Sequence, residues 1–355
     1  MRNFARFLDK GWGVKRNRKV AATWFRKALS NGYTDGLNEL ISTPFNWSKS
    51  FRRELQRLLE DEGLYDGTVN GEVSAVFDDV LWNKAIAGLP EETKRLRQDF
   101  VRVKRSGVKK GLLVRICRFD SNTPQRLMLI NHGLTSVRQK RRSLRPDPCG
   151  PVAEYFAKLG YVVAFPLRRG YGTTGGRFAE GGTNLRCGKP YHYIKAGREI
   201  AADIKSAMQH LFKLPYVASD KAVVFGHSGG GWGTVALSSE NDPAIATYVN
   251  FSGAHGTQKG RPNGNCGTSS LAAAMRKFGK TARVPSLWLY VKNDTYVGPK
   301  FANRLKRAFE KSGGKIQFKM FDTYENEDHY LAGAQGLNIW GPVVADWLKT
   351  QSPPN

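Results

Sequence analysis

The chain has 355 residues, a formal net charge of +26 at pH 7 and an apolar fraction of 40%, with 11% aromatic residues. This apolar content is enough to build a core, which argues against disorder over most of the length, and the length favours two or three domains. The positive charge attracts anions, but no zinc-finger, basic-zipper or RNA-recognition signature accompanies it, so we expect no specific nucleic-acid partner.

Two kinds of segment are not evident in the sequence. No stretch approaches the ~18 consecutive apolar residues of a membrane helix, so we expect no membrane span. The first residues lead into no apolar stretch of the kind that a secretory signal requires, so we expect no export signal in this chain.

Residues 1–45 are predicted to form a helical hairpin. Four apolar residues fall near helical spacing there: Ala21, Trp24, Phe25 and Leu29. The Gly-rich turn at residues 11–14 and the W-x-x-K-A pattern that starts at Trp24 resemble a Sel1-type helical repeat. Such repeats usually need about three units to bury a continuous core, and only one copy is evident, so an ordinary helical hairpin remains an alternative.

Residues 46–92 are predicted to form a second helical unit. Its amphipathic face consists of Leu55, Leu58 and Leu59. Asp66-Gly67 and Asn70-Gly71 then mark two tight turns. This pattern resembles the small peptidoglycan-binding module that is appended to many bacterial envelope enzymes. The resemblance implies a peptidoglycan partner and a periplasmic or envelope location, although such modules also serve as plain spacers. The basic run at residues 93–110 is interpreted as an exposed linker or helix surface.

The four cysteines are Cys117, Cys149, Cys187 and Cys266. None belongs to a CxxC pair, so we expect no zinc or thioredoxin-like site. Cys187 and Cys266 both lie in Gly/Asn-rich loops and could pair in an oxidising compartment. Spacing alone does not establish a disulfide.

From residue 111 to residue 355 the sequence alternates between strand and helix patterns. The strand candidates are residues 112–118, 126–131, 161–165, 221–226, 245–251, 286–292 and 315–321. The helix candidates are residues 151–159, 196–214, 230–239, 271–278, 299–311 and 341–348. Several strands are continuously apolar, as expected for a parallel sheet that is covered on both faces. The alternation therefore predicts a doubly wound, mostly parallel α/β domain that follows small all-α modules.

The strongest chemical signal is Gly226-x-Ser228-x-Gly230, which follows an apolar strand and opens a predicted helix. In a nucleophile elbow the chain turns so sharply that flanking Cβ atoms would clash, so glycines are needed on both sides of the serine. The hydroxyl then projects above the sheet, and the N–H of Gly229 points toward the developing oxyanion. The alternative is a structural Gly-rich turn.

A nucleophilic serine needs a base, and His329 lies after the last predicted strand, where this architecture places its histidine. Asp294 follows the penultimate strand and is the candidate carboxylate that orients the imidazole. The alternatives are an exposed loop histidine and a solvated turn aspartate. His227 should diverge from Ser228 across the turn, and three further histidines, His192, His210 and His255, have no evident polar constellation.

The loop after strand 126–131 is the expected source of a second oxyanion donor. We expect that donor to be the N–H of Leu134, because Gly133 permits a close approach, whereas the alternative is an ordinary glycine turn. The basic segment 138–145 follows directly. We hypothesise that it overhangs the cleft and favours anionic substrates, and the alternative is a solvated loop.

Taken together, residues 111–350 resemble dienelactone-hydrolase-type α/β hydrolases. The blocks that carry the resemblance are residues 131–133, 166–172, 226–233, 250–253, 289–299 and 328–329. The resemblance implies a cofactor-free hydrolase that acts on small acyl compounds such as esters. Dienelactone hydrolases use Cys as nucleophile whereas this chain has Ser228, so a general esterase or a serine peptidase fits better. The alternative from another class is a peptidoglycan-binding envelope protein whose hydrolase domain is vestigial.

Overall fold

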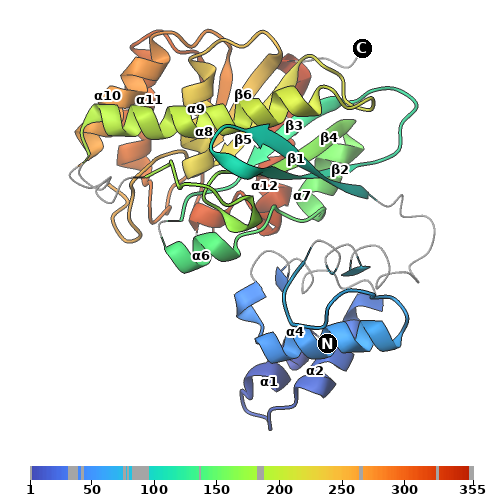
Figure 1. The fold of residues 1–355 in the computed structure, drawn as a ribbon. Coiled ribbons are helices and arrows are strands. Elements are labelled where there is room, and N and C mark those ends of the chain that lie inside the picture. Colours follow the sequence, from blue (N-terminus) through green and yellow to red (C-terminus); the bar gives the residue numbers. More distant parts are fainter. Residues whose placement is uncertain are drawn as a thin grey trace.

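A computed structural model gives the fold (Figure 1), and it describes residues 2–30, 39–40, 44–74, 77, 80–81, 96–135, 137–181, 188–263, 267–324 and 328–351. A helical N-terminal unit precedes a larger unit that is built on one sheet. Within the described residues, no helix combines the length and the low polarity that crossing a bilayer requires.

The larger unit is organised by one eight-stranded sheet with the order β1-β2-β4-β3-β5-β6-β7-β8. The strands are β1 (Arg97–Arg105), β2 (Val108–Arg118), β3 (Arg126–Asn131), β4 (Tyr161–Leu167), β5 (Ala222–His227), β6 (Ile245–Phe251), β7 (Ser286–Val291) and β8 (Ile316–Phe321). β1 and β2 pair antiparallel, and β2 also joins β4 antiparallel, whereas β4, β3 and β5 to β8 pair in parallel. Every residue of β4 is buried, because helices cover both faces of the central strands.

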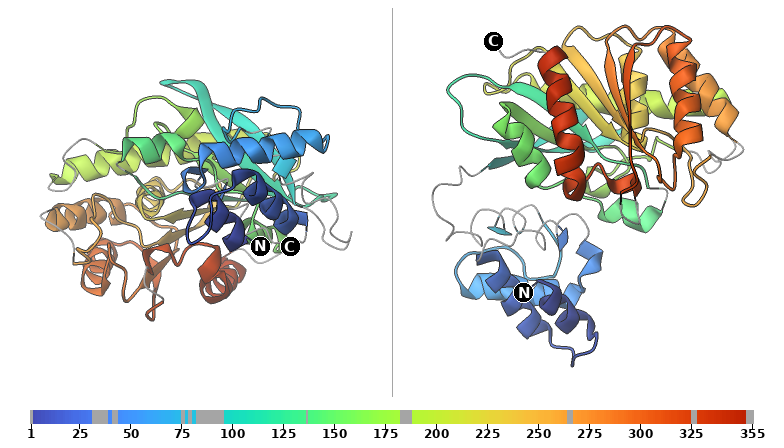
Figure 2. Two further views of the ribbon diagram at one scale, coloured as in Figure 1. Left: turned by 90° about the horizontal axis from the view of Figure 1, so that it is seen from below. Right: turned by 180° about the vertical axis from the view of Figure 1, so that it is seen from behind.

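Helices lie on both faces of the sheet, as Figures 1 and 2 show from opposite sides. One face packs against α8 (Pro190–Leu211), α9 (Gly229–Ser238), α10 (Thr268–Gly279) and α11 (Pro299–Glu310). The other face packs against α7 (Pro151–Lys158) and α12 (Leu337–Gln351). The predicted doubly wound α/β architecture is therefore confirmed, and all seven predicted strands are present: 126–131 and 245–251 have the predicted bounds, and the other five have shifted ends.

The prediction for residues 93–110 was wrong in its central part. Residues 97–105 form β1, which pairs along its length with β2. The sheet therefore begins before residue 111, and the basic side chains belong to an edge strand. Charged residues are common on such strands, because they discourage pairing with other chains.

The N-terminal unit contains α1 (Arg2–Lys10), α2 (Arg18–Ser30), the short turn η1 (Pro44–Asn46) and α4 (Lys49–Asp61). The predicted modules 1–45 and 46–92 contribute to one shared core. At its centre the Phe25 ring meets Trp47, with centroids 5.0 Å apart, and Trp47 stacks on Phe51 at 4.5 Å. The two segments thus pack as one helical body in this structure.

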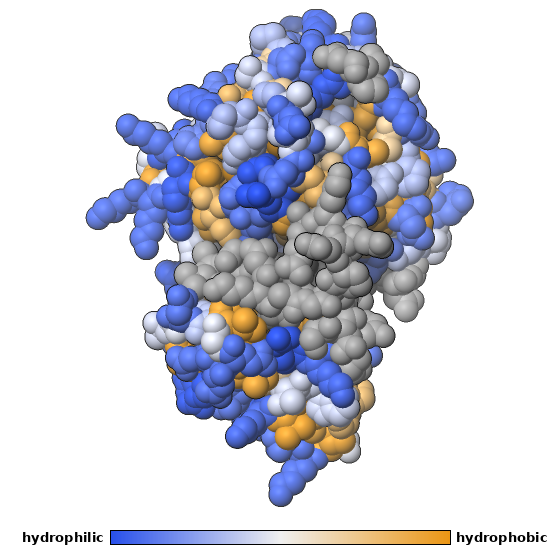
Figure 3. All heavy atoms as spheres, turned by 90° about the vertical axis from the view of Figure 1, so that its right-hand side faces the viewer, coloured by the Kyte–Doolittle hydropathy of each residue, from blue (hydrophilic) through white to orange (hydrophobic). Residues whose placement is uncertain are grey.

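A disulfide joins Cys117 of β2 to Cys149, which lies just before α7, across a sequence separation of 32 residues. Sequence spacing did not predict this pair. The pairing considered for Cys187 and Cys266 lies outside the described residues. On the face that Figure 3 shows, most of the visible surface of both units is hydrophilic.

Candidate active site

The turn between β5 and α9 has the backbone of a nucleophile elbow. Ser228 adopts φ 54° and ψ −118°, a conformation that non-glycine residues rarely take. A Cβ atom on Gly226 would lie 2.3 Å from the carbonyl oxygen of Gly230, and one on Gly230 would lie 2.4 Å from that of Asn131. Both positions therefore require glycine, as the sequence pattern predicted. The Ser228 N–H donates to the carbonyl of Phe251, 2.9 Å away, which ties the elbow to β6.

Asp294 and His329, which are 35 residues apart in the sequence, meet in a buried hydrogen bond. The Nδ1 atom of His329 lies 2.9 Å from Oδ2 and 3.0 Å from Oδ1 of Asp294. Oδ1 also accepts from the backbone N–H groups of Tyr296 (2.7 Å) and Val297 (2.9 Å). Burial alone would raise the pKa of Asp294, but the hydrogen bond and charge of His329, with the two N–H groups, lower it. The carboxylate is thus held ionised, which places the imidazole proton on Nδ1 and leaves Nε2 as a proton acceptor.

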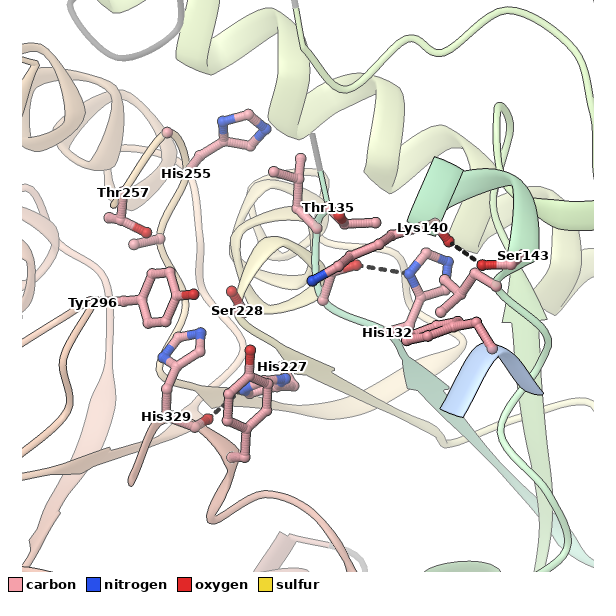
Figure 4. A pocket seen from close by; sticks show the side chains of 17 residues that line it. His132, Thr135, Lys140, Ser143, His227, Ser228, His255, Thr257, Tyr296 and His329 are labelled. Atoms are coloured by element: carbon pink, nitrogen blue, oxygen red, sulfur yellow. Dashed lines mark hydrogen bonds between the residues drawn. The ribbon is translucent and has the colours of Figure 1, made fainter. Parts of the chain in front are cut away.

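His227 contacts the backbone of the candidate base, and this hydrogen bond occupies its Nε2 atom. Its Nε2 lies 2.6 Å from the backbone carbonyl of His329, to which it donates. Burial, assisted by the nearby His329 ring, lowers the pKa of His227 to about 3, so the ring is neutral at ordinary pH. The side chain points away from Ser228, as predicted (Figure 4).

Ser228 and His329 line one cavity of about 330 Å³ (Figure 4). Its wall includes His132, Leu134, Lys140, Ser143, His255, Tyr296, Tyr330 and, from the N-terminal unit, Phe45. Among the described residues no direct hydrogen bond joins the Ser228 hydroxyl to the imidazole. Such contacts often tighten only when substrate binds, so the open geometry is compatible with a catalytic pair.

The predicted oxyanion donors also lie side by side. The backbone nitrogen of Leu134 would be 3.1 Å from a Cβ atom on Gly229. The carbonyl of Gly133 accepts from Nδ1 of His132 (2.7 Å) and from the Arg168 guanidinium (3.3 Å), which also donates to the His132 carbonyl (2.7 Å). In a trans peptide the N–H points opposite to the carbonyl. Anchoring the Gly133 carbonyl therefore directs the Leu134 N–H to the other side of the loop, where Gly229 lies.

The protonation of His132 follows from its two hydrogen bonds. Its Nε2 accepts from the backbone N–H of Arg168, 3.3 Å away, so the proton is on Nδ1, which donates to Gly133. Burial first, and then the charge of Arg168, keeps the pKa of His132 well below its usual range. His132 is therefore a neutral side chain whose two hydrogen bonds fix the conformation of the oxyanion loop.

Sequence reasoning missed the buried network behind this loop. Arg168 forms an ion pair with Glu180, and the Tyr171 hydroxyl donates to the same carboxylate at 2.8 Å. The side chains of Arg168 and Glu180 are 0% and 2% exposed. A basic residue just after a buried strand was the available signal, because this edge of a parallel sheet carries the functional loops.

His255 is a second residue that sequence reasoning passed over. It is 2% exposed and lies in the cavity wall (Figure 4). Burial lowers the pKa of His255 to about 4, and Arg168 acts in the same direction while the nearby Glu180 carbonyl opposes both. Neither ring nitrogen has a hydrogen bond of normal geometry to a described residue. The sequence signal for His255 was its position just after β6, because functional residues gather at the carboxyl edge of a parallel sheet.

The basic segment 138–145 lies beside the cavity and contains α6 (Arg138–Ser143). Lys140 and Ser143 line the cavity itself, whereas Arg141 rests on the Phe178 ring, 4.0 Å from its centroid. Arg141, one of the basic residues of this segment, is thus engaged in a structural contact. Within the described residues, no group of three or more His, Cys, Asp or Glu side chains is arranged to hold a metal ion.

Solved structures of several hydrolases share this architecture. An esterase from Pyrococcus furiosus superposes with a TM-score of 0.50 at 17% identity, covering 73% of this chain and 95% of its own. An acylaminoacyl peptidase in complex with Z-Gly-Gly-Phe-chloromethyl ketone gives a TM-score of 0.52 at 12% identity and covers 73% of this chain. The chain has the α/β-hydrolase fold. The chain spans only 42% of that peptidase's length.

The sequence comparisons add one partial family match. Residues 151–244, which include the elbow, match the prolyl oligopeptidase family, and together these findings support a serine hydrolase of α/β fold. Dipeptidyl peptidase 4 of Porphyromonas gingivalis also superposes, with a TM-score of 0.50 at 16% identity, over 72% of this chain and 36% of its own. No curated protein sequence matches this one significantly. The resemblance predicted from sequence is therefore confirmed at the level of the α/β-hydrolase fold.

Proposed function

We propose that this protein is a serine hydrolase that cleaves carboxylic esters or related acyl compounds, with Ser228 as nucleophile, His329 as base and Asp294 as the orienting carboxylate. The observation that carries the proposal is the convergence of an elbow serine and an Asp294-bound imidazole on one cavity. Ser228 has a strained backbone and the imidazole of His329 is buried. Both conditions cost free energy, so stability alone does not explain them.

The proposed reaction has two steps. His329 Nε2 accepts the Ser228 proton as the hydroxyl oxygen attacks the carbonyl carbon, and the N–H groups of Leu134 and Gly229 bind the oxyanion. The imidazolium, held by Asp294, then gives its proton to the departing alcohol or amine. In the second step water loses a proton to His329 and attacks the acyl-enzyme, which releases the acid and regenerates the serine. These two reaction steps need no metal or cofactor.

The choice between ester and peptide substrates is a finer question. An esterase-like activity is favoured because the superposition covers 95% of the esterase's length but only 42% of the acylaminoacyl peptidase's length. A serine peptidase is the second candidate, supported by the match to the prolyl oligopeptidase family. Turnover of p-nitrophenyl acyl esters beside N-acylated peptide anilides measures the preference directly.

The test of the proposal is Ser228→Ala. We expect it to lose nearly all ester turnover while its circular dichroism spectrum and melting temperature stay close to those of the native protein. Turnover in the variant equal to that of the native protein would refute the mechanism.

The rival function is binding of peptidoglycan through residues 1–92, with a vestigial hydrolase domain. Co-sedimentation of the whole protein with purified peptidoglycan, beside labelling by a fluorophosphonate, separates the two. Labelling at Ser228 supports the enzyme. Sedimentation without labelling supports the rival.

A further inference from the structure

A second cavity lies next to the candidate active site, between the N-terminal unit and α6. Its volume is about 480 Å³, and it is lined from one side by Pro44 and Val73 and from the other by Ser143. Phe45 and Ser143 border both this cavity and the one that holds Ser228, so the two share a wall. A hydrogen bond from Arg145 to the Val73 carbonyl, 3.3 Å long, links the two units at this point.

The charged residues of the second cavity are mostly cationic. They are Arg52, Glu72, Arg138, Arg142 and Arg145. The one carboxylate is already paired, because Glu72 lies 2.9 Å from the ammonium of Lys49. Burial lowers the pKa of Arg52; the charges of Glu72 and Asp9 oppose this shift, and the like charge of Arg145 adds to it. Positively charged side chains from both units thus line one cavity.

Two of these arginines have no structural partner within the described part of the chain. Arg52 donates to the backbone carbonyls of Gly71 (2.6 Å) and Trp47 (2.7 Å), and so holds the turn that carries Phe45. Arg138 and Arg142 are exposed, and their side chains form no ion pair or hydrogen bond with any described residue. They are four residues apart on α6 and so share a face, where like charges destabilise a helix unless something binds them.

We propose that this second cavity is a subsite for an anionic group at the far end of the acyl substrate that Ser228 attacks. The inference rests on the proposed hydrolase function. Guanidinium groups bind carboxylates and phosphates through paired hydrogen bonds, and Arg138 and Arg142 present two such groups on one side of α6. Because Phe45 and Ser143 border both cavities, the anion must be joined to the scissile carbonyl by a spacer that passes these two residues.

The experiment compares matched anionic and neutral esters. The substrates are p-nitrophenyl hemi-esters of unbranched dicarboxylic acids of increasing length, and the same compounds with the free carboxyl methylated. A third arm replaces the carboxylate with a phosphonate. The readout is the ratio of kcat/KM for each anionic ester to that of its neutral match. We expect a preference of about tenfold or more for the anionic ester once the spacer is long enough.

The decisive variant is Arg138→Glu/Arg142→Glu, which should abolish the preference. The matched control is Arg276→Glu/Lys277→Glu on α10, which changes the net charge by the same amount beside a different surface hollow. The control should keep the ratio of the native protein. The inference is overturned if the long anionic esters show no preference, or if both double variants lower the ratio equally.

The same experiment distinguishes failure of the anionic subsite from failure of the proposed hydrolase function. A larger preference for the phosphonate than for the carboxylate assigns the subsite to phosphate-bearing substrates, and the reverse assigns it to carboxylates. Failure of every ester to turn over, with no fluorophosphonate labelling, would instead remove the proposed function. Labelling and neutral-ester turnover without an anionic preference would remove only the subsite.

Discussion

Arg168→Met is the perturbation that tests the oxyanion loop most sharply. Methionine retains an apolar stem but removes the hydrogen bonds to the carbonyls of His132 and Gly133 and leaves Glu180 without its cation. Loss of one oxyanion donor typically costs about 10²–10³ in kcat. His132 still holds the Gly133 carbonyl at 2.7 Å, so we expect the lower end of that range, about 10²-fold, with KM nearly unchanged.

The same variant should also lose stability. Breaking a fully buried ion pair by removing one partner costs about 3–5 kcal/mol, because an unpaired charge is left behind. The Tyr171 hydroxyl still donates to Glu180 at 2.8 Å, which places the expected loss near 3 kcal/mol. Urea denaturation measures this quantity, and steady-state hydrolysis of a neutral ester measures kcat and KM.

The matched control is Arg169→Met. Arg169 is also ion-paired, but with Glu199 and Asp203 on α8, and its side chain makes no described contact with the oxyanion loop. The Arg169→Met variant should therefore have a lower free energy of unfolding but the same kcat as the native protein. Arg168→Lys keeps the positive charge but lacks the planar guanidinium that donates to two carbonyls at once, so its kcat should also be lower than that of the native protein. A folded Arg168→Met variant with native kcat would refute the reasoning, and so would an equal loss of kcat in the Arg169 control.

Three further predictions concern the same framework. Asp294→Asn should lower kcat by about 10⁴-fold with the fold intact, because the imidazole loses its tautomer control; retention of more than a tenth of the native kcat would contradict this role. His255 stays neutral when folded, with a pKa of about 4, whereas an unfolded histidine protonates near pH 6.5. The unfolded state therefore binds more protons between these values, and the stability that His255 contributes above pH 6.5 is lost as the pH falls, by about 2 kcal/mol at pH 5; urea titrations of His255→Gln should show a flatter pH profile, and an unchanged slope would argue against a buried neutral ring. Cys117→Ser/Cys149→Ser should lower the free energy of unfolding by about 3.7 kcal/mol, from the closure entropy of a 32-residue loop; equilibrium denaturation that shows no loss would mean that the crosslink does not form.

The architecture was predictable because its signals are local. A buried parallel strand is a continuous apolar run, and strand ends follow from glycine and charge. The elbow was predictable for the same reason, since a serine between two obligatory glycines at the end of such a strand leaves few conformations. The order of Ser228, Asp294 and His329 then followed from where the strands end.

The errors came from features that local patterns do not contain. In β1 the alternation of Val101 and Val103 with Arg102 and Lys104 indicates an edge strand, but the net charge of the stretch outweighed that period-two signal. The Cys117–Cys149 pair depends on a contact between a strand and a distant loop, which spacing does not encode. The wall that Phe45 contributes to the cavity depends on how two separate units pack.

The central claim is that Ser228 forms the covalent acyl-enzyme. The most direct measurement is trapping with a fluorophosphonate, followed by proteolysis and mass spectrometry of the peptide that contains residues 222–238. We predict one adduct, on Ser228, that forms slowly in Asp294→Asn and not at all in Ser228→Ala. An adduct on another residue, or equal labelling of the Ser228→Ala variant, would contradict it.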